Sequence, residues 1–229
     1  MNNLTPLASV DRSTLAPSAV VGLEAIGITK SYRRGFWPHR RDLPVLRGAD
    51  LAVGPSEVVG LVGENGSGKS TLMKILVGAL AADSGVVKVS GRIGYCPQEP
   101  VLYDRLTCDE HLELFGVAYG MDARAVAAAA DGLYATLAFD RWRAVRVDEL
   151  SGGTRAKLNL ALALLADPDV LLLDEPYAGF DWDTYVRFWD LTAERRAAGR
   201  SVVVISHFIA DEERFDRLVE MRDGRTVRR

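Results

Sequence analysis

The chain has 229 residues, of which 48% are hydrophobic, and its formal net charge at pH 7 is -3. This length and composition fit one large or two small globular domains and exclude a disordered or fibrous chain. The mild charge gives no general electrostatic attraction for nucleic acid, so we expect no nucleic-acid partner. Two cysteines are too few for a disulfide framework or a thiolate zinc site, and they suit a reducing cytosol.

The first segment in chain order is residues 1–20, which lacks the basic start and apolar block of a secretory signal. We expect it to be a poorly ordered tail. From residue 21 to residue 229, short apolar runs alternate with helix-like stretches, which favours a single α/β domain on a largely parallel sheet. No apolar run reaches the roughly 20 residues of a membrane span, so we expect no crossing of a bilayer.

Three runs are nearly continuous in apolar residues, as in parallel strands covered by helices on both faces. They are residues 57–62, 170–173 and 201–205. Each ends in polar residues, where such sheets place their ligands. Between the first two runs, Thr107 and Glu110 have capping-box spacing and residues 123–138 are rich in alanine. We therefore expect a helical subdomain at about residues 104–150, inserted into the α/β core.

A glycine-rich segment follows the first of these strands and precedes a helix-compatible run. Its residues are the candidate phosphate-binding set: Gly63, Glu64, Asn65, Gly66, Ser67, Gly68, Lys69, Ser70 and Thr71. Backbone N–H groups of such a loop surround phosphate oxygens, the helix N-terminus adds a positive dipole end, and Lys69 supplies a full charge. Ser70 is placed to bind Mg²⁺. The alternative is a glycine-rich turn without a ligand, which the flanking strand and helix disfavour.

Two adjacent acids, Asp174 and Glu175, end the second strand. Asp174 is the candidate Mg²⁺ ligand. Glu175 is the candidate general base, because phosphoryl transfer to water needs a carboxylate that orients and polarises the attacking water. Taken alone, an acid pair at a strand end is also compatible with a solvated turn or a helix cap.

With these two motifs, the stretch Leu150-Ser151-Gly152-Gly153-Thr154 resembles the signature motif of the ABC ATPase family. It precedes a helix-compatible run at residues 155–165, so it is also compatible with a simple helix cap and flexible turn. The resemblance implies that Ser151, Gly152 and Gly153 meet the γ-phosphate of ATP bound to a second subunit. Thr154 stands where the family usually has glutamine, a departure that bears on this contact.

Four further residues match family positions in the family's order, and each has an ordinary alternative. The resemblance implies that Tyr32 stacks on adenine, although it is also compatible with a plain strand tyrosine. Gln98 would sense Mg²⁺ and the attacking water, or be a surface residue. Asp181 would link the sites of two subunits, or cap the following helix. His207 would contact the γ-phosphate, or be a structural histidine at a strand end.

The resemblance runs from about residue 21 to the C-terminus. It implies a P-loop NTPase fold with a parallel-sheet core, an antiparallel β subdomain and the helical insertion. It also implies ATP and Mg²⁺ as cofactors, a second ATPase subunit (a second copy or a paralogue), and a separate transmembrane permease subunit. The chain would then lie in the cytoplasm, on the inner face of the membrane.

Residues 93–98, 106–107 and 110–112 look most like ATPase subunits of exporters. We expect His111 to be a helix-packing or surface residue and not a catalytic one, because nothing nearby forms a nucleophile or metal set. Two other functions stay open: a soluble ABC-type ATPase, or a regulatory module that binds nucleotide without turnover. A basic and aromatic stretch at residues 33–41 is compatible with a solvated loop or with contact to lipid headgroups or a partner.

Overall fold

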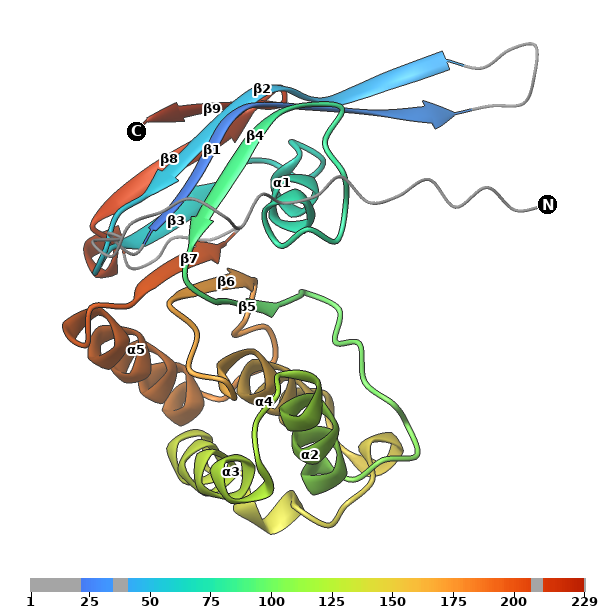
Figure 1. Cartoon of the computed structure of the whole chain (residues 1–229), viewed down its shortest axis with the longest axis vertical. Helices are drawn as coiled ribbons and strands as arrows, with labels where there is room; N and C mark the ends of the chain where they lie inside the picture. Colours follow the sequence, from blue (N-terminus) through green and yellow to red (C-terminus); the bar gives the residue numbers. More distant parts are fainter. Residues whose placement is uncertain (1–21, 35–40, 207–211, 229) are drawn as a thin grey trace.

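A computed structural model describes residues 22–34, 41–206 and 212–228. The expected N-terminal tail, most of the basic aromatic stretch and His207 lie outside these residues. Two sheets and five α-helices make up the described part (Figure 1). None of its helices is both long enough and apolar enough to span a membrane.

The larger sheet has six strands in the order β5-β6-β7-β3-β8-β9. Its strands are β3 (Val58–Val62), β5 (Ile93–Cys96), β6 (Val170–Asp174), β7 (Ser201–Ile205), β8 (Arg217–Arg222) and β9 (Arg225–Arg228). All neighbouring pairs are parallel except β8 and β9. The three apolar runs expected to be buried strands are thus confirmed as β3, β6 and β7, and every residue in them is buried.

The smaller sheet is antiparallel, which confirms the expected β subdomain. It pairs β1 (Gly22–Arg34) with β2 (Arg41–Val53) on one side and β4 (Ser84–Ser90) on the other. In Figure 1 it is drawn above β5, β6 and β7 of the larger sheet, with α1 (Lys69–Leu76) beneath it.

Alternate residues of the central strands enter two separate cores, because successive side chains of a strand point to opposite faces. Leu171, Val202 and Val204 pack with the helices on one face, whereas Leu172 and Val203 pack with α1 and the antiparallel sheet on the other. The helices on the first face are α2 (Cys108–Ala118), α3 (Ala123–Leu137), α4 (Gly152–Leu164) and α5 (Trp182–Ala197). The larger sheet is therefore covered on both faces.

The helical insertion has the local signals that its sequence indicates. Thr107 caps α2: its hydroxyl accepts from the Glu110 N–H, and the Glu110 carboxylate accepts from the Thr107 N–H at 2.7 Å. His111 is fully buried, with Nε2 accepting from the Tyr103 N–H at 2.9 Å and Nδ1 2.8 Å from the Thr107 carbonyl. Of its two predicted interpretations, helix packing or surface, the structure therefore supports helix packing.

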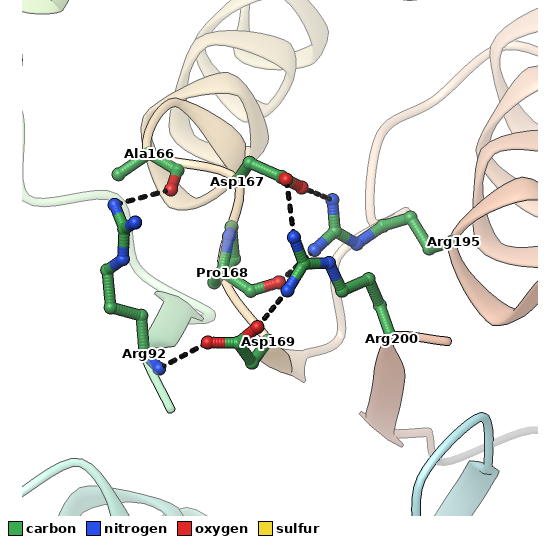
Figure 2. A network of polar contacts seen from close by, with 7 residues as sticks. All are labelled: Arg92, Ala166, Asp167, Pro168, Asp169, Arg195 and Arg200. Atoms are coloured by element: carbon green, nitrogen blue, oxygen red, sulfur yellow. Dashed lines mark hydrogen bonds and ion pairs between the residues drawn. The ribbon is translucent and has the colours of Figure 1, made fainter. Parts of the chain in front are cut away.

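A polar cluster joins the amino ends of β5, β6 and β7 (Figure 2). Asp169 accepts from the Arg92 N–H at 2.8 Å and forms an ion pair with Arg200. Asp167 accepts from Arg200 at 2.7 Å and from Arg195 at 3.2 Å. We name these five residues the amino-end cluster. It fixes the starts of three strands whose other ends carry the candidate site.

Candidate functional site

Four parallel strands deliver the candidate residues to one edge of the sheet. The ends of β3, β5, β6 and β7 lead to the glycine-rich loop, Gln98, the Asp174-Glu175 pair and Ser206, respectively. Carboxyl ends of parallel strands meet at the same edge, where α/β sheets bind their ligands. His207, the candidate that follows Ser206, lies outside the described residues.

The glycine-rich loop has a backbone that only glycine accommodates at two points. Gly63 has φ of 147°, and a Cβ there would lie 2.3 Å from the Met221 carbonyl oxygen. Gly68 has φ of 111°, and its Cβ would lie 2.8 Å from Leu46 Cδ2. Gly68 is also the N-cap of α1, so no side chain caps the first helical turn. The turn presents its N–H groups and positive dipole end toward the loop.

Lys69 reaches back across this loop. Its Nζ donates to the carbonyl oxygens of Gly63 at 2.7 Å and Glu64 at 2.9 Å. Burial lowers the pKa of Lys69, while the charges of Glu175 and then Asp174 act in the opposite direction. The ammonium group is therefore within electrostatic reach of both acids, although they come from a different strand.

The two acids have distinct environments. Asp174 is 2% exposed at the end of β6. Burial of Tyr95, and in second place the charge of Asp174, raise the pKa of Tyr95 to about 12. Glu175 is partly exposed, and its backbone is left-handed with φ of 51°. Its N–H donates to the Ile205 carbonyl at 3.1 Å, which ties the turn to β7. A strained residue with a carboxylate at a ligand-binding edge is typical of functional sites.

Gln98 lies in the bend after β5 and is exposed. The residues just before it are anchored to α4: Asn159 Nδ2 donates to the Pro97 carbonyl at 2.8 Å and to Cys96 Sγ at 3.1 Å. Burial and the charge of Asp174 raise the pKa of Cys96, so this side chain remains a thiol. Sequence reasoning missed Asn159, and the available signal was a polar residue within an apolar helical segment.

The stretch that resembles the signature motif forms the start of α4. Ser151 is the N-cap, with Oγ accepting from the Thr154 N–H at 3.3 Å and lying 2.9 Å from Thr154 Oγ1. The helix begins at Gly152, earlier than residue 155 where the sequence predicted it, because Ser151 caps a first turn that includes both glycines. Ser151 and Gly152 are exposed and Gly153 is partly exposed.

Asp181 caps α5, as one of its two predicted interpretations required. Its carboxylate accepts from the Thr184 N–H at 2.8 Å, and the Thr184 hydroxyl and N–H together hold the pKa of Asp181 below its usual range. The same loop contacts the start of α4, since a Cβ at Gly153 would lie 2.7 Å from the Gly179 carbonyl oxygen. Asp181 is exposed beside the signature stretch, so the cap leaves its other predicted role open.

Tyr32 stands in β1 opposite Leu43 of β2 and is 40% exposed. The β1-β2 pair is close to the glycine-rich loop, because Val45 and Leu46 of β2 line the position of Gly68. An aromatic ring is thus available on the subdomain that covers this loop.

The fold and the site define a P-loop nucleotide-binding domain. Residues 46–178, more than half of the chain, match the family described as ABC transporter. The chain therefore belongs to the ABC transporter family, as an ATP-binding cassette.

Relatives agree with this assignment. Nod factor export ATP-binding protein I of Burkholderia lata is 35% identical over 199 residues, which cover 81% of this chain and 66% of the relative. The protein of the same name from Rhizobium meliloti is 32% identical over 229 residues, which cover 93% of this chain and 66% of the relative. The chain thus spans about two thirds of the length of these curated relatives.

Solved structures have the same fold. An ATP-binding subunit of an ABC transporter superposes with a TM-score of 0.80 at 26% identity, covering 90% of both chains. A dimeric bacterial ABC transporter cassette superposes with a TM-score of 0.82 at 24% identity, covering 90% of this chain and 97% of the other.

Proposed function

We propose that this chain is the ATP-binding and ATP-hydrolysing subunit of a membrane exporter, active when two such subunits close on ATP. One observation carries the proposal: the strand register brings the start of the glycine-rich loop and the Asp174-Glu175 pair to one sheet edge, since Leu61 of β3 and Asp174 of β6 both lie beside Ile205 of β7. A phosphate-binding loop and a pair of carboxylates are the two parts that phosphoryl transfer to water requires.

The loop suits a polyphosphate. Within the described part of the chain, the buried Ser67 Oγ has no hydrogen-bond partner, and a buried hydroxyl is rarely left so. Lys69 is 5% exposed and its Nζ donates to two loop carbonyls, so its charge is directed into the cradle. ATP phosphates would satisfy both groups, and Tyr32 would stack on the adenine.

The acids suit Mg²⁺ and a general base. Asp174 and Ser70 supply oxygen ligands of the kind that Mg²⁺ prefers, and Gln98 would complete the set from β5. Mg²⁺, when bound, would neutralise charge on the phosphates. Glu175 would accept a proton from the attacking water, Gln98 would orient that water, and His207 would contact the γ-phosphate.

The signature stretch supports action in pairs. Its helix α4 packs on the face of the sheet opposite α1, so the two helix N-termini belong to different faces of one chain. The exposed Ser151, Gly152 and Asp181 and the partly exposed Gly153 are therefore available to the ATP of a second subunit. That subunit would be a second copy or a paralogue.

A membrane subunit would dock beside Gln98. Exposed apolar side chains occur in and just before α2: Val101 and Val117 are each 74% exposed and Tyr103 is 57% exposed. Tyr103 and Leu114 also line a shallow hollow there. Exposed apolar patches of this kind mark interaction sites, and they support a peripheral place on the inner membrane face through a permease. The export direction rests on the names of the relatives.

The test combines ATP turnover with assembly. We expect turnover by the purified chain with Mg²⁺ to rise more steeply than protein concentration. Glu175→Gln should lower turnover by at least about 100-fold, the scale of a lost general base, and should elute as an ATP-dependent dimer. The control Lys69→Ala/Glu175→Gln should stay monomeric. Failure of the wild-type chain to bind ATP, or turnover strictly proportional to concentration, would contradict the proposal.

A further inference from the structure

A buried carboxamide connects the signature helix to the segment that carries Gln98. Asn159 lies in α4 and is 7% exposed, between Leu158 and Leu160, which are fully buried. The same helix begins at its cap Ser151, about 12 Å away along the helix axis at 1.5 Å per residue. A buried amide group is tolerated where it has hydrogen-bond partners, and the position of those partners is informative.

Both partners belong to the end of β5. Asn159 Nδ2 donates to the Pro97 carbonyl at 2.8 Å and to Cys96 Sγ at 3.1 Å. A carbonyl oxygen only accepts hydrogen bonds, so the bond to Pro97 fixes which end of the carboxamide faces β5. That carbonyl shares its peptide plane with the nitrogen of Gln98. The Asn159 side chain therefore sets the orientation of the peptide from which Gln98 projects.

Gln98 and Glu99 are exposed, whereas Cys96 is 1% exposed. The bonds from Asn159 thus lie at the boundary between the buried strand and the exposed segment. Upstream, α4 and β5 are also in close contact, since a Cβ at Gly94 would lie 2.2 Å from the Ala163 carbonyl oxygen. Helix α4 therefore contacts the segment before Gln98 at two places, Gly94 with Ala163 and Pro97 with Asn159. The Asn159 contact is the one next to Gln98.

We propose that Asn159 is a positioning residue, which holds the Pro97-Gln98 peptide to the signature helix so that Gln98 and Ser151 keep a fixed relation. The inference rests on the proposed function, because it acts through the role of Gln98 at Mg²⁺ and water. Asn159 itself touches neither. The close packing of α4 on β5 links the signature stretch at the start of α4 to the segment that contains Gln98.

A double-mutant cycle tests the proposal. Asn159→Leu keeps the side-chain size and removes the donors; we expect turnover about tenfold lower and a higher Mg²⁺ concentration for half-maximal turnover, as for other residues that support a metal site indirectly. Combined with Gln98→Ala, the same substitution should have no further effect. Cys96→Ala, which removes the weaker acceptor, should change turnover less than Asn159→Leu. Equal losses from Asn159→Leu with and without Gln98 would overturn the proposal.

A measurement without nucleotide keeps the test independent of activity. The backbone order parameter of the Gln98 N–H, measured by NMR relaxation, should fall in Asn159→Leu from about 0.85, typical of rigid backbone, toward about 0.6, typical of flexible backbone, with the order parameters of β5 unchanged. Should Asn159→Leu fail to fold, Asn159→Ser replaces it in both experiments. An unchanged order parameter at Gln98 in a folded variant would overturn the proposal. Absence of turnover in the wild-type chain would instead contradict the proposed function.

Discussion

Glu175 combines a reactive side chain with an unfavourable backbone. Its φ of 51° is left-handed, a region that costs a residue with a Cβ about 1 to 2 kcal/mol and that glycine adopts freely. Both Glu175→Gly and Glu175→Ala remove the carboxylate, so both should lose turnover. Glu175→Gly should nevertheless be about 1 kcal/mol more stable than Glu175→Ala by urea unfolding. Equal stability of the two variants would show that the turn at Glu175 is unstrained.

The Thr154 hydroxyl lies within hydrogen-bonding distance of the Ser151 hydroxyl. Its Oγ1 lies 2.9 Å from Ser151 Oγ, and Ser151 Oγ also accepts from the Thr154 N–H. If Thr154 donates, the Ser151 O–H is left to donate to an anion. Thr154→Val keeps the shape and removes the hydroxyl; in a Glu175→Gln background it should need up to about tenfold more ATP for half-maximal dimerisation, the effect of one hydrogen bond.

The matched control for this hydroxyl is Thr154→Ser, which retains it and should dimerise like the parent. Nucleotide binding to the monomer, measured at low protein concentration, should be the same in all these chains, because Thr154 belongs to α4 whereas the phosphate loop leads into α1. If the valine and serine variants dimerise at the same ATP concentration, the hydroxyl has no part in the contact.

At the scale of elements, patterns in short stretches of sequence predicted the strands whose structure depends on those stretches alone. The apolar runs predicted β3, β6 and β7 because each is buried on both faces. Lys69 and Asp174 were also predicted as site residues, because each belongs to a motif of consecutive residues. The long pairing of β1 with β2 was not located, since it has three register shifts that disturb the alternation of side chains. Asn159 was missed because its partner Pro97 lies 62 residues away, and no local pattern encodes such a contact.

The packing of α2 on α3 depends on another contact of this kind. A Cβ at Gly116 of α2 would lie 2.2 Å from Val126 Cγ2 of α3. Gly116→Ala should therefore destabilise the chain by about 2 kcal/mol through overpacking. Val126→Ala makes room for the new methyl group, so the double variant should be at least about 1 kcal/mol more stable than the sum of the two single effects.

Gly132 of α3 supplies the control for this pair. A Cβ at Gly132 meets no described atom within 4 Å, so Gly132→Ala should raise stability by up to about 1 kcal/mol through helix propensity. The free energies of unfolding would come from urea titrations. Strictly additive effects at Gly116 and Val126 would mean that the helices separate and do not interlock.

At the scale of the whole molecule, the two edges of the parallel sheet have different tasks. The carboxyl ends of the strands carry the strained Glu175, the buried Lys69 and the exposed Gln98. The amino ends carry the amino-end cluster, in which charges are paired and hydrogen-bonded. Active sites tolerate strain where the surrounding structure is well determined, and strands anchored at one edge provide that support at the other.

Two aspartates of the amino-end cluster separate stability from function. The Asp169 side chain is 20% exposed and pairs with Arg200, which is 28% exposed, whereas the Asp167 side chain is 68% exposed. Removing Asp169 leaves the Arg92 N–H and a partly buried guanidinium without this partner, so Asp169→Ala should cost about 2 kcal/mol. Asp167→Ala removes an exposed carboxylate but also takes a partner from Arg195, whose side chain is only 10% exposed, so it should cost about 1 to 2 kcal/mol. Because both residues lie at the edge away from the phosphate loop, the KM for ATP should stay within about twofold in both variants, which matches an unaltered binding free energy. Urea unfolding beside steady-state kinetics measures the two quantities on the same samples; a large rise in the KM for ATP with either substitution would show that the edges of the sheet are not separate.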